Sequence, residues 1–156
     1  MKKIFLSIFL AGLGITVSAQ KSIDQKVTEL MAKMTLEEKI GQLNQYNDDI
    51  TATGPITKDA DKAGQVRAGK LGSILNAIGA KNTKNWQDQA MQSRLKIPLL
   101  FGQDVIHGFR TTFPIPLGET ATWDMNLIEK SARVAATEAT AYGIHWTVAP
   151  MVDTGR

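Results

Sequence analysis

The sequence alternates three times between a segment with helical periodicity and a short, mostly apolar run. The apolar runs cover residues 71–76, 97–103 and 144–149. Because runs of this length alternating with helices are typical of buried parallel strands, we predict an α/β domain with a parallel sheet. The pattern leaves open whether that sheet is a barrel or open. No glycine-rich phosphate-binding turn follows any of the three runs, which disfavours an open dinucleotide-binding sheet.

Local signals mark where the helices begin. Ser22 or Asp24 is expected to cap the first helix, and Thr35 followed by Glu38 has the form of a capping box for the second. Asp124 is expected to cap a long alanine-rich helix. Helical segments are predicted over residues 23–34, 35–43, 58–68, 82–95 and 124–142, and loops over 44–55 and 108–118.

The first 19 residues have the order of a secretory signal. Lys2 and Lys3 precede an almost wholly apolar stretch over residues 4–15, and small residues lead to Ala19. The apolar stretch is shorter than the about 20 residues that a spanning helix needs. We therefore predict cleavage after Ala19 and a periplasmic or secreted protein with no membrane association afterwards. An uncleaved N-terminal anchor is the alternative interpretation.

Composition argues against several function classes. The chain has no cysteine and only two histidines, and it contains no HExxH or GxSxG pattern. We therefore predict no metal site and no cofactor. Two of the 18 basic residues, Lys2 and Lys3, belong to the leader, and 15 residues are acidic. Since no basic cluster with interleaved aromatic residues stands out, nucleic acid is not expected as a partner.

Asp104 is the candidate substrate-binding residue. It directly follows the second apolar run, and active groups of a parallel barrel gather where the strands end. A carboxylate at that place can accept hydrogen bonds from two sugar hydroxyls and so hold a pyranose ring. The alternative is a structural role, in which Asp104 caps the following turn or pairs with Arg110.

Other polar and aromatic residues are weaker candidates. His107 is expected to stabilise its loop rather than face a sugar, and His145, inside an apolar run, is expected to be a satisfied core histidine. Asp153 is either a second carboxylate at the active face or a turn residue. Core packing, rather than stacking on a sugar, is expected for the three tryptophans, Trp86, Trp123 and Trp146.

Several segments of the chain carry a resemblance to a known family. They are MTLEEKIGQL (34–43), GSILN (72–76), IPLLFGQDVIHG (97–108), Phe113-Pro114 and APMVD (149–153). In this order they resemble the N-terminal part of family 3 glycoside hydrolases of the periplasmic β-glucosidase type. The resemblance spans essentially all of residues 20–156, and DVIHG (104–108) is its most specific part.

The resemblance implies the opening part of a TIM-like (β/α)8 barrel, incomplete in this chain. Residues 1–19 would be the signal peptide and residues 20–156 the truncated N-terminal part of the barrel domain. In the family, the aspartate matching Asp104 hydrogen-bonds the non-reducing sugar in the first subsite. The nucleophilic aspartate and the acid/base glutamate would lie beyond Arg156, so no catalytic residue is expected here and the fragment itself is expected to be inactive.

The function implied for the full-length protein is that of a retaining, exo-acting β-glucosidase. It would release β-linked glucose from the non-reducing end of β-glucosides or oligosaccharides, without a cofactor. Two other readings remain open. One is a β-xylosidase or β-N-acetylglucosaminidase of the same family, and the other is a non-catalytic periplasmic sugar-binding module.

Overall fold

The computed structural model describes residues 20–48 and 61–151. The chain divides into two compact units, Met1–Lys33 and Met34–Arg156. In the first unit, α1 (Ile23–Lys33) starts after Ser22, whose hydroxyl accepts a hydrogen bond from the Gln25 N–H at 3.2 Å. The Gln25 side chain accepts in turn from the Ser22 N–H at 3.0 Å. This reciprocal pair identifies Ser22, rather than Asp24, as the cap.

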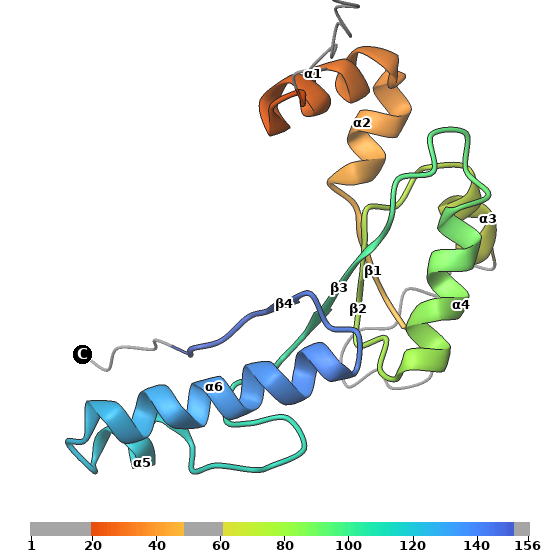
Figure 1. Cartoon of the computed structure of the whole chain (residues 1–156). Helices are drawn as coiled ribbons and strands as arrows, with labels where there is room; N and C mark the ends of the chain where they lie inside the picture. Colours follow the sequence, from red (N-terminus) through yellow and green to blue (C-terminus); the bar gives the residue numbers. More distant parts are fainter. Residues whose placement is uncertain (1–19, 49–60, 152–156) are drawn as a thin grey trace, which may run out of the picture. The chain divides into compact units, whose positions relative to one another are not determined.

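The second unit holds a parallel sheet and its connecting helices (Figure 1). Its elements are α2 (Leu36–Gln42), β1 (Gln45–Asn47), α3 (Lys62–Arg67), β2 (Ser73–Leu75), α4 (Ala80–Ala90), β3 (Leu100–Gln103), α5 (Pro116–Thr120), α6 (Met125–Ala141) and β4 (Trp146–Thr147). The predicted parallel α/β fold is confirmed. The strands neighbour one another in chain order, β1-β2-β3-β4, without the reversal that marks a doubly wound sheet. This order favours the barrel, which the sequence pattern had left open.

One face of the sheet carries the core. Ile74 pairs with Tyr46 on β1 and with Phe101 on β3, and both Ile74 and Phe101 are 1% exposed. The other face carries Leu100, which is 57% exposed, and Leu75, which is half-buried. We expected the strands to be covered on both faces. Within the described part of the chain only one face is covered, because the helical cover reaches the Ile74 side alone.

Two elements were not predicted. β1 lies in the stretch that we expected to be a loop. It was not predicted because Gln45–Asn47 contains no apolar run, and its strand conformation comes from pairing with β2. α5 begins within the loop expected over residues 108–118, and its first residue is Pro116, a residue suited to the first turn of a helix. Of the predicted helices, α1 starts at its predicted residue, and α2, α4 and α6 start within two residues of theirs. The predicted start at residue 58 is outside the described residues.

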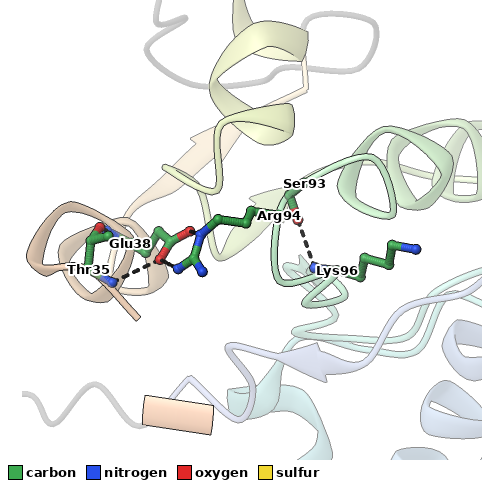
Figure 2. Close-up of polar contacts among 5 residues, drawn as sticks. All are labelled: Thr35, Glu38, Ser93, Arg94 and Lys96. Atoms are coloured by element: carbon green, nitrogen blue, oxygen red, sulfur yellow. Dashed lines mark hydrogen bonds and ion pairs between the residues drawn. The ribbon is translucent and has the colours of Figure 1, made fainter. Parts of the chain in front are cut away.

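The capping box at the start of α2 is confirmed and is joined to a distant residue (Figure 2). The Thr35 hydroxyl accepts from the Glu38 N–H, and the Glu38 carboxylate accepts from the Thr35 N–H at 2.9 Å. Arg94, in the turn after α4, donates to both carboxylate oxygens through Nε at 3.1 Å and a terminal nitrogen at 2.5 Å. This fork connects α2 to the segment that leads into β3.

We predict that the Glu38–Arg94 pair makes the free energy of unfolding depend on pH. The Arg94 hydrogen bond, followed by that from the Thr35 backbone, holds the pKa of Glu38 below its ordinary value of 4.5. The stabilisation is therefore present above pH 4.5 and is lost as the pH falls through the lowered pKa. Measured by denaturant unfolding, the free energy of unfolding of the wild type should exceed that of Glu38→Gln at neutral pH. The difference should disappear at acidic pH.

Asp88→Asn is the matched control for that experiment. Asp88 pairs with Lys84 on the surface of α4, where both side chains are exposed, so its removal should change stability little. A wild type that stays more stable than Glu38→Gln by a constant amount down to low pH would contradict the role given to Glu38.

Candidate functional site

Asp104 is the first residue after β3, at the edge where the parallel strands end. Its side chain is exposed, and within residues 20–48 and 61–151 no hydrogen bond or ion pair engages its carboxylate. Arg110, considered above as a partner, instead lies with its guanidinium 5.6 Å from the centre of the Tyr142 ring. The described residues therefore support neither structural role for Asp104, and its carboxylate is open to solvent.

The alternation of side chains along β3 assigns Asp104 to a face of the sheet. Phe101 points into the core, whereas Leu100 and Gly102 belong to the opposite, uncovered face. Asp104 continues the series of Leu100 and Gly102. It therefore stands above the uncovered face, which would be the interior of the barrel if the sheet closed.

A row of buried amide and carboxylate side chains lies at the same edge, beside Asp104. Asn76, which follows β2, donates through Nδ2 to the Asn47 side-chain oxygen at 2.9 Å, and its backbone N–H donates to the Gly102 carbonyl at 2.9 Å. Asp48, which follows β1 and is 2% exposed, accepts from Nδ2 of Asn82 on α4. These bonds fix the ends of β1 and β2 against β3.

Sequence reasoning missed this row, although one signal was present. Asn76 follows an apolar run and adopts a φ of 65°, a conformation that asparagine tolerates better than most residues. An asparagine at the end of a buried strand could thus have been singled out. Asp48 carried no such signal, because β1 itself was not recognised.

The residues after Asp104 form a tight loop over residues 105–113, called here the 105–113 loop. The Val105 N–H donates to the Thr147 hydroxyl on β4 at 3.2 Å, and the Phe113 N–H donates to the His107 carbonyl at 2.8 Å. Gly108 has a φ of 100°, and a Cβ there would lie 1.9 Å from the Thr111 carbonyl oxygen. Glycine is therefore required at this turn.

The two histidines have different surroundings. His145 accepts the Phe101 N–H at Nδ1, 3.1 Å away, and its ring stacks on Phe101 with centres 5.5 Å apart. It is hydrogen-bonded, as expected, but it lies exposed beside β3 rather than in the core. His107 is exposed and lines an apolar hollow of about 460 Å³ between the loop and α6.

Core packing is confirmed for one tryptophan and is wrong for two. Trp86 is half-buried against the core cluster. Trp123 is 93% exposed, because it occupies the turn before α6 with a φ of 56°. Trp146 is 41% exposed and packs its indole over Gly102, where a Cβ would lie 2.7 Å from the indole nitrogen, on the uncovered face.

Comparison with known proteins identifies the family. The model of the glycosyl hydrolase family 3 N-terminal domain matches residues 35–156. The chain belongs to glycoside hydrolase family 3. The match begins at Thr35, the capping residue of α2, and includes Asp104 together with the 105–113 loop.

Relatives of the family 3 chain include several β-glucosidases. A periplasmic β-glucosidase of Salmonella typhimurium is 41% identical over 134 residues, which are 85% of this chain and 17% of that protein. β-Glucosidase C of Emericella nidulans is 31% identical, over 90% of this chain and 26% of its own length. The family 3 chain thus spans about a quarter or less of these two relatives.

Solved structures confirm the fold class of the family 3 chain. The β-glucosidase of Listeria innocua in complex with isofagomine superposes with a TM-score of 0.76 and 39% identity, over 85% of this chain and 18% of that one. The N-terminal domain of such an enzyme is a TIM-like barrel. The four parallel strands are therefore part of a TIM-like barrel, and their uncovered face is the side that lines its interior.

Some predictions about the family 3 chain fall outside the described residues. They concern the leader over residues 1–19, Asp153, and the position of Arg156. In the described ranges, no group of histidine, aspartate and glutamate side chains is arranged to hold a metal ion. None of the helices described is both long and apolar enough to cross a membrane.

Proposed function

We propose that this chain is the N-terminal part of an exported, retaining and exo-acting β-glucosidase in which Asp104 holds the terminal sugar. The observation that carries the proposal is the exposed carboxylate of Asp104, unpaired among the described residues, at the carboxyl end of β3. Its position above the barrel-interior face supports a ligand role, because barrel enzymes bind substrates at this end. The relatives named as β-glucosidases support the choice of sugar.

The proposed role of Asp104 is binding and orientation. An ionised carboxylate can accept one hydrogen bond at each oxygen, so two neighbouring hydroxyls of a terminal glucose fix the ring in register. The chemistry of a retaining glycosidase then needs two further carboxyl groups, one as nucleophile and one as acid and base. In this proposal both belong to segments beyond the present chain, which alone would have no activity.

The proposed site of action is the periplasm or the cell exterior. The support comes from the leader-like order of residues 1–19 and from the Salmonella relative, which is named a periplasmic β-glucosidase. The proposed domain organisation is a signal peptide over residues 1–19 followed by barrel residues from 20 onward.

A β-xylosidase is the second candidate. A β-xylosidase of Formosa agariphila is 28% identical over 163 residues, covering 98% of this chain. Xylose lacks the hydroxymethyl group of glucose and has the same ring hydroxyls, so an Asp104 carboxylate that binds two ring hydroxyls would accept either sugar. In that arrangement, residues other than Asp104 would distinguish the two sugars.

The test is to assay the full-length protein on aryl β-glucoside, β-xyloside and N-acetyl-β-glucosaminide. We expect kcat/KM to favour the glucoside by at least about tenfold, the size of effect that one additional buried group produces in a binding site. The first product, observed by NMR, should be β-glucose, since two displacements retain the configuration.

Three results would replace the proposal. A preference for the xyloside would assign the second candidate, and a preference for the aminosugar would assign a hexosaminidase. Binding of glucose without hydrolysis of any of the three substrates would indicate a sugar-binding protein.

A further inference from the structure

The 105–113 loop is attached to α6 by one carboxylate. Glu138 Oε2 accepts hydrogen bonds from the backbone N–H groups of Arg110, at 2.7 Å, and of Thr111, at 2.8 Å. Its other oxygen, Oε1, accepts from the Thr111 hydroxyl at 2.7 Å. Three charge-assisted bonds from two adjacent loop residues thus converge on a single side chain.

The carboxylate is held in the form that accepts all three bonds. The Thr111 hydroxyl, then the Thr111 and Arg110 backbone N–H groups, keep the pKa of Glu138 below its ordinary value. Glu138 is therefore ionised at neutral pH, with no proton on either oxygen to compete for the loop.

A second attachment comes from Tyr142, the residue that caps the C-terminal end of α6. Tyr142 lies four residues after Glu138, and its ring packs against the Phe109 ring in a T-shaped arrangement with centres 5.2 Å apart. The guanidinium of Arg110 lies 5.6 Å from the centre of the same ring. One helix face, through Glu138 and Tyr142, therefore holds three consecutive loop residues, 109–111.

The attachment reaches Asp104 through a short and braced stretch of chain. Gly108 and Thr112 form an isolated antiparallel bridge, and the Phe113 N–H bonds the His107 carbonyl, so the loop is closed on itself. Its first residue, Val105, is tied to Thr147 on β4. Asp104 thus sits between the end of β3 and a loop whose far side is fixed by Glu138.

We propose that Glu138 is a positioning residue for substrate binding, which holds the 105–113 loop against α6 and thereby orients Asp104 toward the sugar. The inference rests on the proposed function of Asp104. Glu138 itself lies on α6 and is bonded to the loop, so it acts through Asp104 rather than on the substrate.

Loss of the Glu138 bonds should weaken substrate binding. A loop that is correctly placed only part of the time weakens apparent affinity by the fraction of molecules in the competent arrangement. If removal of the Glu138 bonds left the loop in place about a tenth of the time, kcat/KM would fall about tenfold. The change should be larger for Glu138→Ala than for Glu138→Gln, which keeps an acceptor oxygen for the backbone N–H groups.

The experiment compares Glu138→Ala, Glu138→Gln and Thr111→Val in the full-length protein, with Thr137→Ala as the matched control. Thr137 is the preceding residue of α6, and among the described residues its hydroxyl donates only to the Arg133 carbonyl of its own helix. We expect faster hydrogen exchange of the loop amides in Glu138→Ala, a smaller increase in Thr111→Val, and none in Thr137→Ala. The loss of kcat/KM should follow the same order.

A double-mutant cycle separates positioning from general destabilisation. If Glu138 acts through Asp104, Glu138→Ala should lower kcat/KM about tenfold in the wild type and have little further effect in an Asp104→Ala background. Equal effects in the two backgrounds would overturn the proposal, as would unchanged loop exchange in Glu138→Ala. If Glu138→Ala does not fold, Thr111→Val tests the proposal instead, through the hydrogen exchange of the loop amides and through kcat/KM in the wild-type and Asp104→Ala backgrounds.

The cycle also distinguishes this proposal from the proposed function. A near-normal kcat/KM for Asp104→Ala would remove Asp104 from the sugar site, whatever Glu138 does. If Asp104→Ala lowers kcat/KM strongly and Glu138→Ala does not change it, the sugar site stands and only the positioning role of Glu138 is rejected.

Discussion

Replacing Asp104 by alanine in the full-length protein is expected to lower kcat/KM on an aryl β-glucoside by about 30-fold or more. A hydrogen bond to a charged group contributes about 1.5–3 kcal/mol, and a loss of about 2 kcal/mol corresponds to about 30-fold. The proposed Asp104 carboxylate accepts two such bonds, so the loss should exceed that of a single one. Steady-state kinetics at neutral pH provides the measurement.

Two further variants make the result specific. Asp104→Asn keeps the shape and one acceptor oxygen but removes the charge, so its kcat/KM should lie between those of the wild type and Asp104→Ala. Asp88→Ala removes an exposed carboxylate of α4 that pairs with Lys84 on the same helix, and it should leave kcat/KM unchanged. If Asp104→Ala retains near-normal activity, the site proposed at the end of β3 is wrong.

Phe101→Ala is expected to destabilise the protein by about 3–5 kcal/mol. The Phe101 ring is 1% exposed, belongs to the core cluster and stacks on His145. Its removal loses buried apolar area and leaves a cavity under β3, the strand that Asp104 directly follows. Since whole domains are stable by only about 5–15 kcal/mol, this single change should remove a large part of the total.

Chemical denaturation measures the effect of Phe101→Ala. The midpoint should fall strongly relative to the wild type, whereas Lys84→Ala, an exposed change on α4, should stay within about 0.5 kcal/mol of it. A loss below about 1 kcal/mol for Phe101→Ala would mean that the covered face of the sheet is not the core described here.

Local features of the fold could be predicted from the sequence because they depend on residues within one helical turn. The Thr35–Glu38 capping box spans four residues, and Asp124 accepts hydrogen bonds from the N–H groups two and three positions later. The same is true of the place of Asp104, since a carboxylate directly after an apolar run marks the end of a strand. The parallel α/β class follows from the repeated helix and strand pattern.

The features that could not be predicted from the sequence depend on contacts between residues that are far apart in the chain. β1 is a strand because it pairs with β2, although its own sequence is polar. The bonds of Asn76 to Asn47, Arg94 to Glu38 and Thr111 to Glu138 join residues 29, 56 and 27 positions apart. No local pattern specifies such partners, because they meet only once the strands pair and the helices pack. The sequence by itself therefore determined the elements, the family resemblance and the candidate carboxylate, and packing decided which side chains hold that carboxylate in place.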